Sequence, residues 1–187
     1  MTVLGGLGSA IVTPFRADGA VDVAALRALA VWQIEEGVDF LVPCGSTGEA
    51  QTLTAGERDL VVSTVLEAAS GRVPVMAGAT SNDTRQAVEE ARRMSALGVS
   101  WLLSATPYYN KPTPEGLFRH FSAIADASRV PICLYNVPGR TALNMQPAII
   151  SNGNESSALF PSHLANMGFY LLRVRSNLVV IRSVLDR

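Results

Sequence analysis

The sequence has few charged residues, few aromatic residues and a single lysine, Lys111. Charged residues make up 17% of the 187 residues, aromatic residues make up 6%, and the formal net charge is −1. Like charges never run for five residues or more, so the chain lacks the electrostatic pattern of proteins that bind nucleic acid or anionic membranes. We therefore expect neither nucleic acid nor membrane among its partners.

Long hydrophobic runs and paired cysteines are also missing. No segment approaches the ~20 apolar residues that a membrane span needs, and residues 1–19 lack the basic start and apolar stretch of a secretory signal. These absences predict a cytoplasmic protein. Cys44 and Cys133 form no C-x-x-C pair and have no metal-type spacing to histidine, so we interpret both as reduced core thiols. We treat neither His120 nor His163 as a ligand, and we expect no metal and no cofactor.

Apolar residues are abundant and follow a regular order along the chain. They make up 48% of the sequence, enough for a substantial core in a globular chain of this length. From residue 8 to about 150, short β-type runs alternate with longer helix-type runs. The β-type runs are almost continuously apolar, which is typical of strands covered on both faces in a parallel sheet. The strand candidates are residues 9–15, 39–46, 73–80, 100–107 and 130–137.

Helix start and stop signals separate the strand candidates. Residues 21–37 predict a helix that ends at Gly37, where a left-handed residue is favoured. Thr54 and Glu57 predict a capping box at the start of the next helix. The apolar stripe of the first helix consists of Val23, Leu26, Ala30 and Ile34, and the remaining signals are Asp83 and Thr113–Pro114 at helix starts and Gly71 and Gly98 at helix ends.

A strand recurs about every 30 residues, which is the length of a βα unit with a right-handed crossover. A doubly wound sheet and a (β/α)8 barrel both fit this rhythm. No G-x-G-x-x-G follows the first strand candidate, and GSTGE lacks the lysine of a P-loop, so we favour an α/β fold of the (β/α)8 TIM-barrel type. A complete barrel takes about 250 residues. We therefore expect an incomplete barrel of about five βα units over residues 1–150 and a divergent tail over residues 151–187.

Polar residues gather where the strand candidates end, the rim on which barrel enzymes build their sites. Ser46 and Thr47 follow the second candidate, Tyr109 the fourth, and Tyr135 ends the fifth. The GSTGE turn offers two hydroxyls and several backbone N–H groups, which suits a small carboxylate, although an ordinary capped βα turn has the same appearance. A small-molecule site on this rim is the hypothesis to test.

Three hydroxyl groups of this rim could form a proton relay. A phenol has an unperturbed pKa near ~10, so it carries protons at neutral pH only when hydrogen-bonded to other hydroxyls, as Thr47, Tyr109 and Tyr135 could be. Packing for buried area is the alternative use of both tyrosines. Arg140 could hold a second carboxylate bidentately or be a solvated loop charge. We interpret Lys111 as a solvated loop residue.

Three stretches of the chain, in their order and spacing, carry a family resemblance: GSTGE (45–49), SATPYYNKPTPEGL (104–117) and LYNVPGRT (134–141). They resemble the dihydrodipicolinate synthase family of the N-acetylneuraminate lyase superfamily, which contains pyruvate-dependent class I aldolases. The resemblance runs from about residue 4 to about 150. It implies a (β/α)8 barrel, usually a homotetramer of two tight dimers. It also implies a lyase that condenses pyruvate with aspartate semialdehyde in the diaminopimelate pathway of lysine biosynthesis.

The resemblance also implies a role for each rim residue. Ser46 and Thr47 would bind the pyruvate carboxylate, and Thr47 would also belong to the proton relay. Tyr135 would be the general acid and base, and Tyr109 would be the tyrosine that reaches across a dimer interface into a neighbouring site. Arg140 would receive the carboxylate of the aldehyde substrate. The implied partners are pyruvate, a small aldehyde and further copies of the chain.

A lysine for the covalent step is missing from the expected place. Class I aldolases need an amine that attacks the pyruvate carbonyl and holds it as a Schiff base. The family carries this lysine one strand after Tyr135, about 30 residues on, where residues 160–170 contain none. Lys111 precedes Tyr135 in a loop that the family does not use for this step. Arg182 lies in an apolar segment, but a guanidinium keeps its proton and forms no imine.

Two hypotheses follow from a site that has the family's rim residues but lacks its lysine. The chain is an enzyme of the dihydrodipicolinate synthase type whose activity is doubtful because the Schiff-base lysine is absent. Alternatively, it is an inactive remnant left by truncation or a reading-frame change near residue 150. Within the enzyme class, N-acetylneuraminate lyase or a sugar-acid aldolase is the runner-up. Residues 169–175 and 178–185 could form a hairpin or one helix, and an unclosed set of strands would leave exposed edges.

Overall fold

The computed structural model describes residues 5–145, in which five strands alternate with helices as the sequence predicts. Every strand is shorter than predicted; β2 to β5 lie within their predicted ranges, whereas β1 begins at Gly8, one residue before its predicted start. The expectations for the tail, including those for His163 and Arg182, fall outside the described residues. The elements are β1 (Gly8–Ala10), α1 (Val23–Glu35), β2 (Phe40–Val42), η1 (Ala50–Thr52), α2 (Ala55–Ala69), β3 (Met76–Gly78), α3 (Thr84–Ala96), β4 (Trp101–Ala105), α4 (Pro114–Ala127), β5 (Ile132–Tyr135) and α5 (Pro138–Thr141).

The chain divides into two compact units. Unit 1 comprises Met1–Gly78 and Met94–Leu102, and unit 2 comprises Ala79–Arg93 and Leu103–Arg187. The strand order is β1-β2 in one sheet and β3-β4-β5 in the other, so consecutive strands of the chain are neighbours within each sheet.

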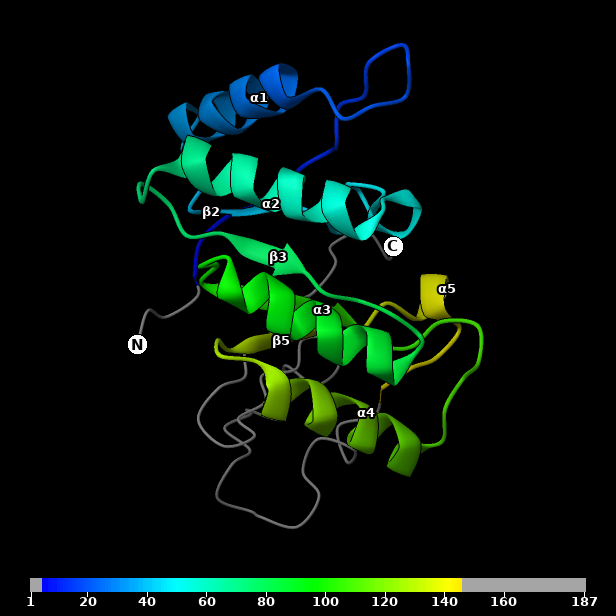
Figure 1. Ribbon diagram of the computed structural model, residues 1–187. Coiled ribbons are helices and arrows are strands. Elements are labelled where there is room, and N and C mark those ends of the chain that lie inside the picture. Colours follow the sequence, from blue (N-terminus) through cyan, green and yellow to red (C-terminus); the bar gives the residue numbers. More distant parts are fainter. Residues whose placement is uncertain (1–4, 146–187) are drawn as a thin grey trace. The chain divides into compact units, whose positions relative to one another are not determined.

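Unit 1 is built on parallel strands. β1 and β2 pair in parallel with Gly8 opposite Phe40, and a parallel bridge joins Leu41 to Val75 just before β3. Helices α1 and α2 lie side by side (Figure 1). The buried apolar residues of the two helices are Leu26 and Ala30 of α1 and Val61, Val62, Val65, Ala68 and Ala69 of α2. The nearly continuous burial of β2 and β3 fits strands covered on both faces.

Unit 2 contains the β4–β5 part of the second sheet with α4 and most of α3. The backbone N–H of Thr106 donates to the Tyr135 carbonyl at 3.2 Å, and the N–H of Ala79 donates to the Leu103 carbonyl at 2.8 Å. Leu117 and Ile124 of α4 are fully buried. Because β5 carries a buried run of Ile, Cys and Leu before Tyr135, the polar residues of LYNVPGRT begin where the core ends.

The predicted helix caps are confirmed. The hydroxyl of Thr54 accepts from the Glu57 N–H while the Glu57 carboxylate accepts from the Thr54 N–H, which completes the capping box. The carboxylate of Asp83 accepts from the Arg85 N–H at 2.9 Å, and the hydroxyl of Thr113 accepts from the Gly116 N–H at 3.2 Å. The predicted helix-ending glycines, Gly37, Gly71 and Gly98, all have positive φ.

Two short helices were not predicted. Helix α5 occupies part of what the sequence suggests is a loop, because Pro138 lacks an N–H group and fits the first position of a helix. The 3₁₀ turn η1 follows GSTGE directly. Cys44 and Cys133 are buried and form no disulfide, as predicted. Within residues 5–145, no helix combines the length and apolar character that a membrane crossing requires.

Candidate functional site

The GSTGE turn connects β2 to η1 in unit 1 through two consecutive tight turns. The N–H of Gly48 donates to the Gly45 carbonyl at 3.0 Å, and the N–H of Glu49 donates to the Ser46 carbonyl at 3.2 Å. Cys44 and Glu49 flank the turn with φ of 55° and 54°, a left-handed conformation that costs a non-glycine residue about 1–3 kcal/mol. The buried hydroxyl of Thr13 holds the Gly48 carbonyl at 2.7 Å. The turn is therefore fixed by its neighbours, although it is not part of a helix or strand.

Two glycines allow this turn to pack closely. A Cβ on Gly48 would lie 3.0 Å from the Ile11 carbonyl oxygen, and a Cβ on Gly78 would overlap the Cys44 carbonyl. The N–H of Gly78 donates to the Pro43 carbonyl at 2.9 Å, so β3 braces the chain at the start of the turn. The absence of a side chain at both positions thus allows close backbone packing around the turn.

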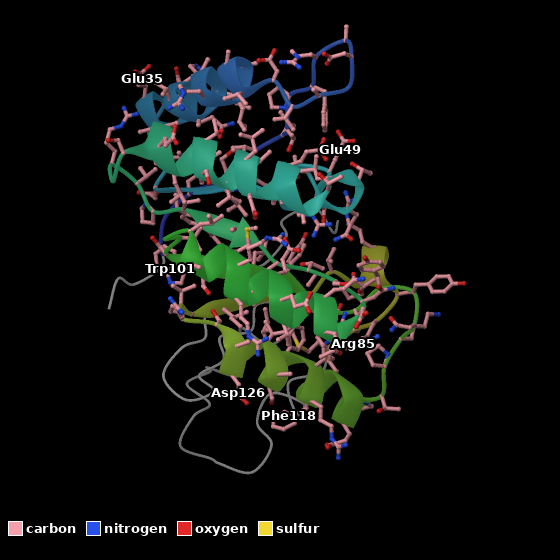
Figure 2. All side chains as sticks on the ribbon, viewed as in Figure 1. Glu35, Glu49, Arg85, Trp101, Phe118 and Asp126 are labelled. Atoms are coloured by element: carbon pink, nitrogen blue, oxygen red, sulfur yellow. The ribbon has the colours of Figure 1, made fainter. Side chains whose placement is uncertain are left out.

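Ser46 and Thr47 project from the turn into solvent. Within the described part of unit 1, neither hydroxyl has a hydrogen-bond partner, and neither backbone N–H donates to a carbonyl. Two hydroxyls and two N–H groups without partners in one short turn can together bind a small anion such as a carboxylate. The exposed carboxylate of Glu49, at the end of the turn (Figure 2), would repel such an anion.

Tyr135 ends β5 in unit 2 and is half-buried. Its carbonyl accepts from Thr106, whereas its phenol has no hydrogen-bond partner within the described part of unit 2. The strand therefore fixes the backbone of Tyr135 and leaves the phenol oxygen to a ligand or to another hydroxyl. A proton-carrying role for Tyr135 requires a hydrogen bond from this phenol to another hydroxyl, and this role stays a prediction.

Asn136 and Thr141 shape the segment that follows Tyr135. The amide of Asn136, 8% exposed, donates to the Asn144 side chain at 2.9 Å, and its oxygen accepts from the Met145 N–H at 3.0 Å. The buried hydroxyl of Thr141 accepts from that of Thr106 at 3.0 Å. Sequence reasoning missed these bracing roles; the available signal was a polar side chain directly after a buried strand.

Arg140 lies in α5 and is exposed. Its backbone N–H donates to the Val137 carbonyl at 2.9 Å, and its guanidinium has no ion-pair partner within the described part of unit 2. A guanidinium fixed at its base and unpaired at its tip can take a carboxylate in a bidentate manner. Both alternatives for Arg140, carboxylate ligand and solvated charge, agree with this position.

The loop after β4 presents Tyr109 to solvent in a strained conformation. Tyr109 is 91% exposed and has φ of 72°, and Lys111 has φ of 42°. Two asparagines hold the loop, and we call them the amide clasp. The Asn110 amide donates to the Asn82 carbonyl at 3.1 Å, and the Asn82 amide donates to the Tyr108 carbonyl at 3.4 Å. Strain maintained by side-chain hydrogen bonds is typical of functional loops.

The predicted site residues are distributed over both units. Ser46 and Thr47 belong to unit 1, and Tyr109, Tyr135 and Arg140 belong to unit 2. Within unit 2, no hydrogen bond joins Tyr109 to Tyr135. The convergence of the three hydroxyls stays a prediction. The exposed position of Lys111 agrees with the interpretation of this residue as a solvated loop residue.

His120 of α4 is a buried titratable group of unit 2. It is 3% exposed, and its Nδ1 lies 2.9 Å from the Thr84 hydroxyl of α3. Burial lowers the pKa of His120 to about 4, so the ring is neutral near pH 7. Its Nε2 is buried without a hydrogen-bond partner. Among residues 5–145, no three histidine, cysteine or acidic side chains gather in a way that could hold a metal ion.

Comparison with known proteins gives one consistent family. The dihydrodipicolinate synthetase family matches residues 3–158. A 4-hydroxy-tetrahydrodipicolinate synthase of Koribacter versatilis is 57% identical over 148 residues, which are 79% of this chain and 49% of the relative. One of Anaeromyxobacter sp. is 54% identical over 159 residues, 85% of this chain and 54% of the relative.

A solved structure agrees with the sequence comparisons. The chloride-inhibited dihydrodipicolinate synthase of Acinetobacter baumannii, in complex with pyruvate, shares 44% identity and a TM-score of 0.76 over 78% of this chain and 50% of that one. The predicted fold class, an incomplete α/β barrel of the (β/α)8 type, is confirmed. The chain spans about half the length of the relatives it matches. With three motifs, five βα units and these matches in agreement, the chain belongs to the dihydrodipicolinate synthetase family.

Proposed function

We propose that this chain provides the pyruvate-binding part of a 4-hydroxy-tetrahydrodipicolinate synthase. The observation that carries the proposal is the GSTGE turn, whose two hydroxyls and two backbone N–H groups lack partners within the described part of unit 1. The Acinetobacter baumannii relative, which shares 44% identity, was solved with pyruvate. The reaction is the condensation of pyruvate with aspartate semialdehyde in lysine biosynthesis.

The turn would bind the carboxylate of pyruvate, and Tyr135 would exchange protons with the keto oxygen. Ser46 and Thr47 would donate hydrogen bonds to the carboxylate and so fix the orientation of the keto acid. The phenol of Tyr135 donates a proton to the keto oxygen and later takes one back, so it acts as general acid and base. Thr47 would pass the proton on to solvent through the Tyr109 of a neighbouring copy. Each transfer needs hydroxyl groups within about 3 Å of one another.

Tyr109 would act in the site of a neighbouring copy. Its side chain is 91% exposed and directed outward by the amide clasp, so it is available to another chain. An aromatic side chain on a rigid loop loses little entropy when it is bound. The proposed assembly is a homodimer or a pair of such dimers, in which each pyruvate site is completed by its neighbour.

Arg140 would select the second substrate. Aspartate semialdehyde carries a carboxylate, and the guanidinium of Arg140 is exposed at the end of α5 with no ion-pair partner within the described part of unit 2. A bidentate pair with this carboxylate would orient the aldehyde toward the pyruvate carbon. An aldolase that accepts uncharged sugar aldehydes has no need for this charge.

The covalent step would require a lysine from outside this chain's site. Imine formation joins an amine nitrogen to the keto carbon of pyruvate and releases water. Lys111 is the only lysine among the 187 residues, and it lies exposed in the loop that bears Tyr109. We therefore propose that the chain binds pyruvate without forming a covalent bond and does not turn over by itself.

Reduction of the protein with borohydride in the presence of pyruvate tests the covalent part. We expect the intact mass to stay unchanged, because no amine reaches the keto carbon. A bacterial relative that has the lysine is the positive control, and Lys111→Arg is the matched variant. A pyruvate adduct on Lys111 of the wild type would overturn the proposal that the nucleophile is missing.

Saturation-transfer NMR with pyruvate tests the binding part separately. We expect weak binding by the wild type, reduced about tenfold or more in Thr47→Val and in Ser46→Ala, because a hydrogen bond to a charged group contributes about 1.5–3 kcal/mol. Comparison of the two variants shows which hydroxyl contributes more. Binding that both variants leave intact would remove the turn from the site.

A further inference from the structure

Helix α1 carries apolar residues on two opposite faces. Leu26 and Ala30 are fully buried on the inner face. At 100° per residue, Ala24, Ala28 and Trp32 lie on the opposite face, with Val31 at its border. Ala24, Ala28 and Trp32 are exposed and Val31 is half-buried. A helix that is apolar all round is normally covered on both sides.

No element of the described part of unit 1 covers the outer face of α1, because α2 lies along its other side (Figure 1). This outer face forms an open hollow of about 890 Å³. Trp32, 55% exposed, stands beside the small side chains of Ala24 and Ala28. The same surface therefore contains a large projecting apolar side chain, Trp32, and a shallow apolar depression over Ala24 and Ala28. The hollow is lined by Arg16, Asp22, Val23, Ala24, Arg27, Ala28, Val31, Trp32 and Glu35.

We propose that the outer face of α1 binds a second copy of this chain about a two-fold axis through Ala28. Ala24 and Trp32 lie four residues on either side of Ala28, which is about 6 Å along the helix in each direction at 1.5 Å per residue. Antiparallel pairing of two α1 helices then places each Trp32 over the Ala24 of the other copy. The contact is self-complementary, as a closed two-fold interface requires.

Charge supports this arrangement. Glu35, labelled at the end of α1 in Figure 2, has no ion-pair partner within the described part of unit 1, and it lies at one end of the hollow. Arg16 lies at the other end, near the start of the helix, where it also forms an exposed ion pair with Asp18. Antiparallel pairing brings Glu35 of one copy toward Arg16 of the other and places helix dipoles in opposite directions. Arg27, at the edge of the hollow, already pairs with Glu67 of α2.

The area of the α1 contact determines the affinity that we expect for the dimer. Thirteen residues span about 20 Å, so the contact buries less than the roughly 1,200–2,000 Å² of a stable interface. We expect a weak dimer, with a dissociation constant in the micromolar range or above. This surface contains neither Tyr109 nor any other residue of the proposed pyruvate site, so the inference does not depend on the proposed function.

Analytical ultracentrifugation and acrylamide quenching of tryptophan fluorescence test the inference together. Trp101, 3% exposed, provides a shielded background, so the quenchable signal comes from Trp32. We expect the sedimentation coefficient to rise between about 1 and 300 µM while quenching of Trp32 falls several-fold. The measurement is made in wild type and in Tyr109→Ala, which separates this surface from association through the Tyr109 loop.

Ala28→Arg places a charge at the proposed axis and should abolish both effects. Ala96→Arg, at the exposed end of α3, adds the same charge elsewhere and should preserve both. Trp32→Ala should weaken association at least tenfold, and circular dichroism shows whether each variant is folded.

Three outcomes would overturn the inference. The first is a monomer with quenchable Trp32 at every concentration. The second is association that survives Ala28→Arg. The third is a monomer whose Trp32 is shielded until residues 146–187 are deleted, which would show that the chain covers this face itself.

Discussion

The two segments that carry the candidate site use their polar groups in opposite ways. In the GSTGE turn of unit 1, the hydroxyls and N–H groups of Ser46 and Thr47 have no partners among the unit's described residues, and glycine packing fixes the backbone. In the LYNVPGRT segment of unit 2, Asn136 and Thr141 use their side chains to hold the backbone, and Tyr135 and Arg140 are left for other molecules. Residues of similar polarity in two motifs thus divide into ligand-binding groups and braces.

The largest expected effect comes from the packing that fixes the turn. Gly78→Ala would force a Cβ into the Cys44 carbonyl, so we expect a loss of about 3–5 kcal/mol in unfolding free energy. Urea unfolding followed by circular dichroism measures it. Gly56→Ala in α2 is the matched control, because no atom lies within 4 Å of its Cβ, and it should stabilise slightly. Equal effects of the two substitutions would contradict the idea that the turn depends on close packing.

The difference between polar groups that brace the backbone and polar groups that bind a ligand is tested by one substitution in each segment. Asn136→Ala leaves the buried N–H of Met145 without an acceptor, and we expect it to cost about 2–3 kcal/mol of stability. Ser46→Ala removes an exposed, unpartnered hydroxyl, so stability should change by less than about 0.5 kcal/mol while pyruvate binding falls. Thermal melts and pyruvate titration by NMR measure both. A Ser46→Ala variant as unstable as Asn136→Ala would remove the distinction between braces and binding groups.

Acidification should weaken unit 2 through His120. Burial lowers the pKa of His120 to about 4 in the folded state, below the unfolded value of about 6.5. The unfolded chain binds more protons between these values, so stability falls as the pH decreases from about 6.5 to about 4. We expect a loss of about 2 kcal/mol, allowing for partial screening by solvent.

Unfolding by urea at several pH values, in the wild type and in His120→Gln, isolates this contribution. The glutamine can still approach Thr84 but does not titrate, so the pH-dependent part should shrink in the variant. Identical pH profiles for the two proteins would show that His120 is not the group responsible.

The smallest expected effect concerns the amide clasp. Asn110→Ala removes the hydrogen bond to the Asn82 carbonyl, which should cost about 1 kcal/mol and release the strained conformation of Tyr109. We expect chymotrypsin to cleave after Tyr109 several-fold faster in the folded variant. Lys111→Ala, next to the clasp, should cleave at the wild-type rate.

The sequence predicted the elements because their signals are local. The Thr54–Glu57 capping box, the Thr113–Pro114 start and the buried strands all depend on neighbours within a few residues. The bracing role of Asn136 could not be predicted, because it depends on Met145 and Asn144 returning to the strand end. The four-residue α5 was missed because Pro138 and Gly139 also suit a loop.

All site residues except Arg140 were proposed from their position at or after strand ends. The structure places Tyr135 at the end of β5, and Ser46, Thr47 and Tyr109 in the loops that follow β2 and β4. The exposure of these side chains could not be predicted from their positions. The exposure of Tyr109 depends on two asparagines that lie 28 residues apart in the chain, which no local pattern reveals. The second apolar face of α1 was visible in the sequence, but one stripe was assigned to the core and the other was overlooked.

The bracing of each half of the site by nearby contacts has a practical consequence. The GSTGE turn is held by Thr13, β2 and β3, whereas the segment after Tyr135 is held by Thr106 and by its own asparagine and threonine. Each segment therefore keeps its conformation through contacts close to it. Together with its few supporting side chains, it could be transplanted onto the strand ends of an unrelated protein with a parallel sheet.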